Sequence, residues 1–249
     1  MFESSLFLWI IGFSLLGSIG AIGGAALILL FPDTMRKRLL PCLLSYATGT
    51  LLGAAFLGMI PKSMQQAPPL NISITILAGI VTFFILEKIL LWRHCHDEGC
   101  EIHSQTGPLI LIGDAFHNFV DGLVIAAAFL TSIPMGIATS LAVIAHEIPQ
   151  EVGDFAILLH SGYEKMRALV LNFLSSLTTL LGAVVAYYFL TETRQLVPYI
   201  LAISAASFIY IAVADLVPSL HKNTGLKATV LQVSLILAGI ATIALFRFR

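Results

Sequence analysis

Two stretches of membrane-spanning length carry polar side chains at regular intervals. The first stretch contains Asp114, His117, Asn118 and Asp121. The second contains His146, Glu147, Gln150, Glu151 and Asp154. Residues three, four and seven positions apart share one face of an α-helix, and both sets follow these offsets, with His146 adjacent to its stripe. We therefore predict two polar helical stripes that face each other.

The residue types in these stripes suit a divalent metal ion. Neutral imidazole together with carboxylate oxygen favours zinc, iron, manganese and neighbouring first-row metals, whereas an all-oxygen set would favour magnesium or calcium. Neither stripe contains cysteine, and a thiolate-rich site would hold zinc too tightly for release. Because the ligands must be deprotonated, acid should weaken metal binding.

A purely structural role is the competing interpretation of the stripes. A single buried amide such as Asn118 or Gln150 often makes only an interhelical hydrogen bond. Ionisable groups at bilayer depth, however, cost about 2.5–3.5 kcal/mol each even on insertion scales, and the stripes contain seven titratable residues. This cost favours a functional site over structural hydrogen bonding.

The composition indicates an integral membrane protein. The chain of 249 residues is 58% hydrophobic and 11% charged, with a mean hydropathy of +0.95, whereas soluble domains are about 25% charged. A spanning helix needs about 20 mostly apolar residues. About eight such stretches occur, near 4–30, 40–60, 70–92, 108–130, 133–160, 167–190, 197–219 and 226–247. Their short connections predict one all-α transmembrane domain over residues 1–249, and the first stretch is too long and lacks the basic start of a signal peptide.

The distribution of lysine and arginine predicts the orientation. With the N-terminus outside, eight of these residues fall in inner loops and four in outer segments, which favours both termini outside. The net charge of −1 and the absence of a polybasic tail give no indication of a nucleic-acid partner. We expect a multi-pass protein of the plasma (inner) membrane.

A predicted cytoplasmic loop over residues 93–107 concentrates metal-ligating side chains. They are His94, Cys95, His96, Cys100 and His103. Imidazole and thiolate suit zinc and similar metals, but the spacing is not a standard zinc-finger pattern. The loop could contact metal as a flexible sensing or delivery segment, or it could be only a solvated linker.

Other spans add polar and small residues. Asn172, Ser176 and Thr179 share a helix face, which could complete a cavity but is more often interhelical packing. Asp215 in the seventh span could line an inner exit or simply end a helix. Gly49 and Gly53 predict a small-residue contact surface. Pro149 predicts a kink within the second stripe because proline cannot donate a backbone hydrogen bond.

At this point the residues resemble a known family. The segments 117–122 (HNFVDG) and 146–154 (HEIPQEVGD) closely resemble the fourth- and fifth-helix signatures of the ZIP (zinc- and iron-regulated transporter-like) family. The resemblance implies eight transmembrane helices in a 3+2+3 arrangement, the first and last three forming an inverted repeat. It also implies uptake of divalent metals, notably zinc, iron, manganese and cadmium, into the cytoplasm as substrates, with no resident cofactor and with a homodimer as the family expectation.

The resemblance also implies a ligand set. His117, Asp121, His146 and Glu147 would form one metal site, and Asn118, Glu147 and Gln150 an adjacent one, so that Glu147 could bridge them. Many family members have a second histidine where this chain has Gln150, an amide that ligates metal only weakly. We assign Asp114, Glu151 and Asp154 to supporting or entry and exit roles.

Two alternatives compete with transport. An intramembrane metal-dependent hydrolase would need the zinc-protease pattern, which begins at His146-Glu147 but fails because Gln150 replaces the second histidine and Pro149 interrupts the helix. A sensor would bind metal in detergent without moving it into liposomes. The polar-lined central pair of spans favours a transport pathway, and we expect no enzyme activity.

Overall fold

The computed structural model describes residues 2–92, 106–222 and 224–247, and every regular element within these ranges is helical. Eight spans follow one another along the chain, and three of them, the second, sixth and seventh, are interrupted or extended by short turns. The elements are α1 (Phe2–Leu30), α2 (Asp33–Gly53), the π-helical turn η1 (Ala54–Met59), α3 (Ile60–Gln66), α4 (Pro69–Trp92), α5 (Thr106–Thr131), α6 (Ile133–His160), α7 (Lys165–Ser176), α8 (Thr178–Glu192), the 3₁₀ turn η2 (Arg194–Leu196), α9 (Val197–Tyr210), the π-helical turn η3 (Ile211–Leu216), α10 (Val217–Leu220) and α11 (Leu226–Arg247).

The lengths and hydropathy of these elements match a membrane protein. Within the described ranges, seven helical segments are long and apolar enough to span a bilayer. The remaining span, α6, has 28 residues but lower hydropathy, because its second half carries one of the polar stripes. It continues through Pro149 as a single helix.

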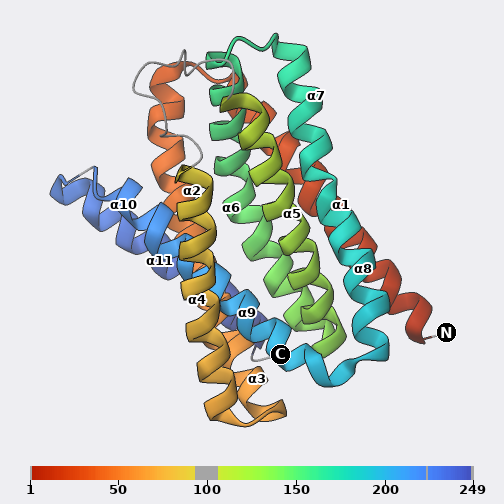
Figure 1. Cartoon of the computed structure of the whole chain (residues 1–249). Helices are drawn as coiled ribbons and strands as arrows, with labels where there is room; N and C mark the ends of the chain where they lie inside the picture. The colour runs from red at the N-terminus through yellow and green to blue at the C-terminus, as the bar shows by residue number, and fades with distance from the viewer. Residues whose placement is uncertain (1, 93–105, 223, 248–249) are drawn as a thin grey trace.

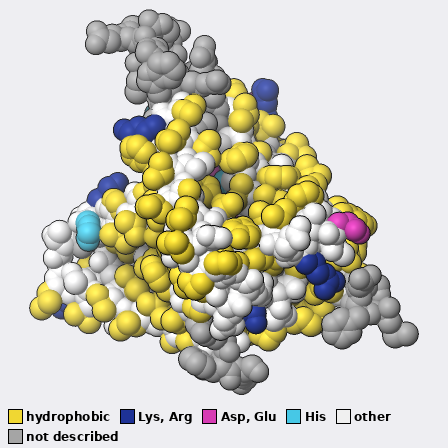
Figure 2. Space-filling model, turned by 60° about the horizontal axis from the view of Figure 1, so that its bottom comes forward, with side chains coloured by type: hydrophobic (Ala, Val, Ile, Leu, Met, Phe, Trp, Pro, Cys, Tyr) yellow, Lys and Arg dark blue, Asp and Glu magenta, His cyan; other side chains and the backbone are white. Residues whose placement is uncertain are grey.

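Burial follows the pattern expected when lipid is the surrounding solvent. Leu8, Leu77 and Ile112 are more than 60% exposed, while Asp121, Glu147 and Glu151 are buried at 0–1%. Figure 2 shows hydrophobic side chains over most of the face turned to the viewer, with charged groups in isolated spots. The apolar surface and the polar interior both fit a bundle embedded in a bilayer.

The spans group into two bundles that pair in an inverted pattern (Figure 1). In the first bundle, α5 packs on α8 and α1 packs on α6; in the second, α11 packs on α2 and α4 packs on α9. The repeat exchanges α1 with the α7–α8 span, the α2–α3 span with the α9–α10 span, α4 with α11, and α5 with α6. This exchange converts the α5–α8 pair into the α6–α1 pair and the α11–α2 pair into the α4–α9 pair. The expected 3+2+3 arrangement is therefore visible in the packing.

Close helix contacts are made possible by glycine. A Cβ on Gly49 would lie 2.1 Å from the carbonyl oxygen of Ile236, and one on Gly239 would lie 2.4 Å from that of Tyr46. In the other bundle, a Cβ on Gly122 would lie 2.0 Å from the Thr179 carbonyl oxygen. Backbones this close leave no room for a side chain, which confirms the small-residue surface predicted at Gly49.

Two π-helical turns precede prolines at matching places in the second and seventh spans. The six residues of η1 end two positions before Pro61, and the six of η3 end two positions before Pro218. Ile60 donates its backbone N–H to the carbonyl of Ala55, and Val217 to that of Ala212, each five residues back. Because proline has no N–H, the preceding turn widens by one residue to keep its own donors paired.

Helix α1 begins and helix α11 ends on the same side of the bundle (Figure 1). We call this the terminal side; it also holds residues 67–68, Ser132 and Thr193. The opposite side holds residues 31–32, 161–164, 221–222 and 224–225.

Candidate metal centre

Four potential ligands converge between α5 and α6. Their ligand atoms all lie within 4.8 Å of one another, and they belong to His117, Asp121, His146 and Glu147. His146 Nε2 is 3.2 Å from His117 Nε2, 3.3 Å from Asp121 Oδ2 and 3.5 Å from Glu147 Oε1. His117 Nε2 is 3.3 Å from Glu147 Oε1. The helical offsets thus bring all four residues to one point.

Four of the six separations match the edges of a tetrahedral metal site, and the other two pairs of ligand atoms lie within 4.8 Å. With metal–ligand bonds of 2.0–2.1 Å, two ligand atoms of tetrahedral zinc lie about 3.3 Å apart. The four measured separations fall between 3.2 and 3.5 Å. A first-row divalent ion therefore fits among these atoms with little rearrangement of the side chains.

The orientation of His146 leaves one ring nitrogen available as a ligand. Its Nδ1 lies 3.0 Å from the backbone carbonyl oxygen of Ala142 one turn earlier. A carbonyl can only accept, so Nδ1 carries the hydrogen and the neutral ring presents the Nε2 lone pair to the cluster. Such a bond also fixes the ring orientation, as is usual for metal-binding histidines.

The two carboxylates of the cluster are buried without protein hydrogen-bond donors beyond the imidazoles. Both oxygens of Asp121 and both of Glu147 lack a hydrogen-bond partner, and these residues are 0% and 1% exposed. A buried carboxylate in this state is costly unless a cation neutralises it. The burial therefore supports a cation-binding role for this group.

A second group of carboxylates adjoins the first through Glu147. It comprises Asp114, Glu147 and Glu151, all buried, with ligand atoms within 4.8 Å of one another. Asp114 is held by neutral donors: Asn118 Nδ2 lies 2.9 Å and Gln150 Nε2 3.3 Å from its Oδ1. The amide nitrogens of Asn118 and Gln150 thus point to Asp114, and the carboxylates supply the oxygen atoms of this second group.

The remaining predicted residues lie around these two groups. Asn172 donates to the backbone carbonyl of Glu151 at 3.2 Å, and the backbone carbonyl of Ser176 accepts a 2.8 Å bond from Ser18; both link α7 to neighbouring helices. Asp154 is half-buried on α6. Asp215 is exposed on η3.

Sequence reasoning missed one residue of this network, Ser175. Its hydroxyl donates to Asp114 Oδ2 at 2.5 Å, while Thr179 donates to the amide oxygen of Asn118 at 2.8 Å. A signal was present, because Asn172, Ser175, Ser176 and Thr179 repeat the 0, 3, 4 and 7 offsets of the two stripes. The sixth span therefore carries a third polar stripe, interrupted at Leu177 between α7 and α8.

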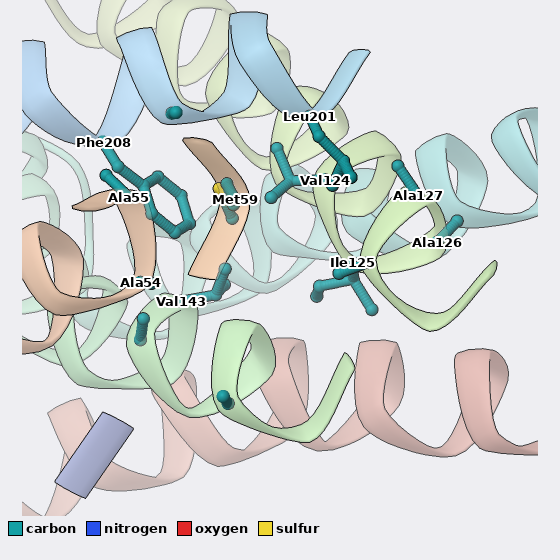
Figure 3. Packing of buried hydrophobic residues seen from close by; sticks show 14 of the residues in the cluster. Ala54, Ala55, Met59, Val124, Ile125, Ala126, Ala127, Val143, Leu201 and Phe208 are labelled. Atoms are coloured by element: carbon teal, nitrogen blue, oxygen red, sulfur yellow. The ribbon is translucent and has the colours of Figure 1, made fainter. Parts of the chain in front are cut away.

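Apolar side chains of η1, α6 and α9 pack together next to the cluster, and Figure 3 shows four of them, Ala55, Met59, Val143 and Phe208. Ala55, Met59, Val143 and Phe208 are at most 1% exposed and belong to one buried core. The Phe208 ring lies edge-on to the His146 ring, with centroids 6.0 Å apart. Toward the terminal side, the cluster is therefore closed by packed side chains.

Toward the opposite side, the cluster meets a cavity. His117, whose side chain is 21% exposed, lines a cavity of about 220 Å³ together with Glu87, Tyr210 and Asp215. The Tyr210 hydroxyl donates to Glu87. Of the four ligand residues, only His117 lines this cavity.

The five predicted loop ligands, His94, Cys95, His96, Cys100 and His103, lie outside the described residues. Cys42 is a half-buried free thiol in α2.

Comparison with known proteins gives consistent results. The family model described as "ZIP Zinc transporter" matches residues 93–247. "Zinc transporter ZIP13" of Pongo abelii is 34% identical over 261 residues, which cover 94% of this chain and 77% of that protein. The Homo sapiens protein of the same name is 30% identical over 94% of this chain and 80% of its own length. Human "Zinc transporter ZIP4" is 46% identical over a shorter region, 46% of this chain and 18% of that protein.

The all-helical membrane fold, with its buried imidazole and carboxylate cluster, and these relatives define a transporter of metal cations rather than an enzyme. The family match covers more than half of the chain, and relatives at least 30% identical cover most of it. The chain belongs to the ZIP zinc transporter family.

Proposed function

We propose that this protein moves zinc, and other divalent transition-metal ions such as iron, manganese and cadmium, through the cluster between α5 and α6. The observation that carries the proposal is the convergence of His117, Asp121, His146 and Glu147 at tetrahedral spacing in a buried position. The names of the similar proteins support zinc as the substrate.

The geometry suggests how the ion would pass. An ion at the cluster exchanges its water for two imidazole nitrogens and two carboxylate oxygens. His117 is the ligand that contacts the cavity on the opposite side, so the ion leaves past this ring. Passage from the terminal side requires the two bundles to shift, because Met59 and Phe208 fill the space there.

We further propose that both termini lie outside, that the ion moves into the cytoplasm, and that the protein resides in the plasma (inner) membrane. The lysine and arginine distribution supports the orientation. A homodimer is expected only from the family resemblance. The pairing of Gln150 with Asp114 gives no support to a hydrolase, since this amide is not placed as a second zinc-protease ligand.

The test is zinc uptake into proteoliposomes by the wild type and by His117→Ala and Glu147→Ala proteins. Each substitution removes a ligand, so uptake should fall at least about tenfold. His221→Ala is the matched control, because this histidine is exposed at the end of α10 and its loss should leave uptake unchanged. Normal uptake by His117→Ala and Glu147→Ala proteins that insert and purify like the wild type would contradict the proposal. Zinc binding without uptake by the wild type would indicate a sensor.

A further inference from the structure

The cavity at His117 has a counterpart on the terminal side of the molecule. This second cavity, of about 350 Å³, is lined by residues of η1, α3, α6 and α11, among them Ala54, Gly58, Lys62 and Ala138. We call it the terminal-side cavity and the one at His117 the opposite-side cavity. Both lie where a π-helical turn of one bundle meets α5 or α6 of the other.

The inverted repeat relates the two cavities residue by residue. Ala54 precedes Pro61 by seven positions, and Ile211 precedes Pro218 by seven; both line their cavities. Gly58 precedes Pro61 by three positions and Asp215 precedes Pro218 by three, and these also line the two cavities. The shared π-turn geometry makes the two cavities equivalent halves of one route on either side of the cluster.

The face of α6 that carries His146 leads directly to the terminal-side cavity. Ala138, Ala142 and His146 are four residues apart and so lie on one face. The eight residues from Ala138 to His146 span about 12 Å along the axis. Between Ala138 and His146 this face carries Thr139, which also lines the cavity, and the small Ala142 and Val143 of the buried core. An ion approaching the cluster from the terminal side would therefore cross this cavity first.

The two cavities differ in charge. The opposite-side cavity is lined by the carboxylates of Glu87 and Asp215, whereas Lys62 is the one charged residue among those that line the terminal-side cavity. Where the inverted repeat would place a carboxylate, the terminal-side cavity has Gly58. A cationic group in a cleft with apolar walls lowers the local concentration of other cations.

We propose that Lys62 limits the rate at which divalent cations enter from the terminal side. The inference rests on the proposed function, because it assumes that ions reach the cluster through the terminal-side cavity. Lys62 acts on entry alone, since it lies beyond the apolar core from the four ligand residues. Removing its charge should speed entry without altering the affinity of the cluster.

The experiment compares wild type, Lys62→Gln and Lys62→Arg in vesicles whose outer face is the terminal side. At low ionic strength and subsaturating zinc, Lys62→Gln should raise the initial uptake rate about threefold or more, because repulsion of a divalent ion is relieved. High ionic strength should shrink this gain. Lys62→Arg keeps the charge and should match the wild type, and zinc affinity in detergent should be the same for all three.

A second variant keeps the test decisive if Lys62→Gln folds poorly. Gly58→Asp supplies the carboxylate found at the equivalent Asp215, and a Cβ at Gly58 would meet only Met135 Cε at 3.7 Å, an ordinary contact. It should also raise uptake at low ionic strength. Unchanged rates in Lys62→Gln and Gly58→Asp, a gain insensitive to salt, or an equal gain in Lys62→Arg would each overturn the proposal for Lys62. Zinc uptake that stays at the wild-type rate in His117→Ala would instead overturn the proposed function.

Discussion

The residue with the most informative surroundings is Gln150. Its amide donates to Asp114, which also accepts from Asn118 and Ser175. Gln150 thus helps to hold a buried carboxylate in place beside the group that shares Glu147. Gln150, which stands where many family members have histidine, therefore makes a hydrogen bond from its amide nitrogen to Asp114. A histidine at this position would have to make that bond with a ring nitrogen.

Gln150→His should shift metal preference. A histidine here would add an imidazole nitrogen to the oxygen-only group of Asp114, Glu147 and Glu151, and imidazole suits zinc better than manganese. In competitive uptake into proteoliposomes, the ratio of zinc to manganese taken up should rise roughly several-fold. Gln150→Met is the control, because it removes the amide and adds no nitrogen. Identical competition curves for Gln150→His and the wild type would count against any contact between residue 150 and the ion.

Much of the candidate site could be predicted at this scale. Helical offsets place His117, Asp121 and Glu147 on two stripes, with His146 adjacent, because a regular helix fixes which side chains share a face; the family resemblance then implied that these four form one ligand set. The hydrogen bond from Ser175 to Asp114 could not be predicted, because Ser175 lies in a span far from Asp114 in the chain. A serine in a membrane helix is also commonly a packing residue. The partner of Glu87 could not be predicted either, because its hydrogen bond with Tyr210 joins α4 to α9, which are far apart in the chain.

Among the helices, the contact between α5 and α8 bears most directly on the site. Gly122 follows the ligand Asp121, and the backbone of α8 passes so close that a Cβ would lie 2.0 Å from the Thr179 carbonyl oxygen. Thr179 in turn donates to Asn118. Spacing between these helices therefore sets the position of the ligands on α5.

Gly122→Ala should destabilise the protein by about 1–3 kcal/mol, because an added methyl group forces two packed backbones apart. Gly153→Ala is the matched control, since nothing lies within 4 Å of a Cβ there and alanine favours the helix by up to about 1 kcal/mol over glycine. Thermal unfolding in detergent should show a lower midpoint for Gly122→Ala and an equal or higher one for Gly153→Ala. Equal midpoints for Gly122→Ala and the wild type would show that α5 and α8 can separate freely.

Most element boundaries were predicted to within a few residues, but the second span runs over Asp33–Gln66 rather than 40–60, and the internal geometry of the spans was not predicted. Apolar runs indicated all eight spans, although α6 falls short of the hydropathy of the other seven because of its polar stripe. The π-helical turns before Pro61 and Pro218 could not be predicted, because a proline can kink, end or widen a helix depending on its neighbours. The break at Leu177 carries no proline or glycine signal in the sequence.

In the whole molecule, eight spans place both chain ends on the terminal side. The count of spans was predictable, whereas the pairing of α11 with α2 and of α4 with α9 was not, because it joins segments far apart in sequence. The resemblance to the ZIP family implied an inverted repeat, and this pairing makes it visible in the structure.

Tags at the N- and C-termini should both be accessible to an impermeant antibody on intact cells, while a tag inserted at residues 161–164 should require permeabilisation. The even number of spans demands that the two termini agree, and the lysine and arginine distribution predicts that they lie outside. Two termini accessible only after permeabilisation would reverse the direction of transport that we propose, and termini on different sides would be incompatible with eight spans.

The hydrogen bond from His146 to the Ala142 carbonyl bears on the ionic charge that the cluster can hold. If both imidazoles are neutral, the four ligand residues carry two negative charges from Asp121 and Glu147. A divalent ion then leaves these four ligand residues electrically neutral, whereas a monovalent or trivalent ion would leave among them an uncompensated charge, which costs roughly several kcal/mol in a medium of low dielectric constant. Electroneutrality in the bilayer would thus discriminate by ionic charge before ligand softness discriminates between divalent metals.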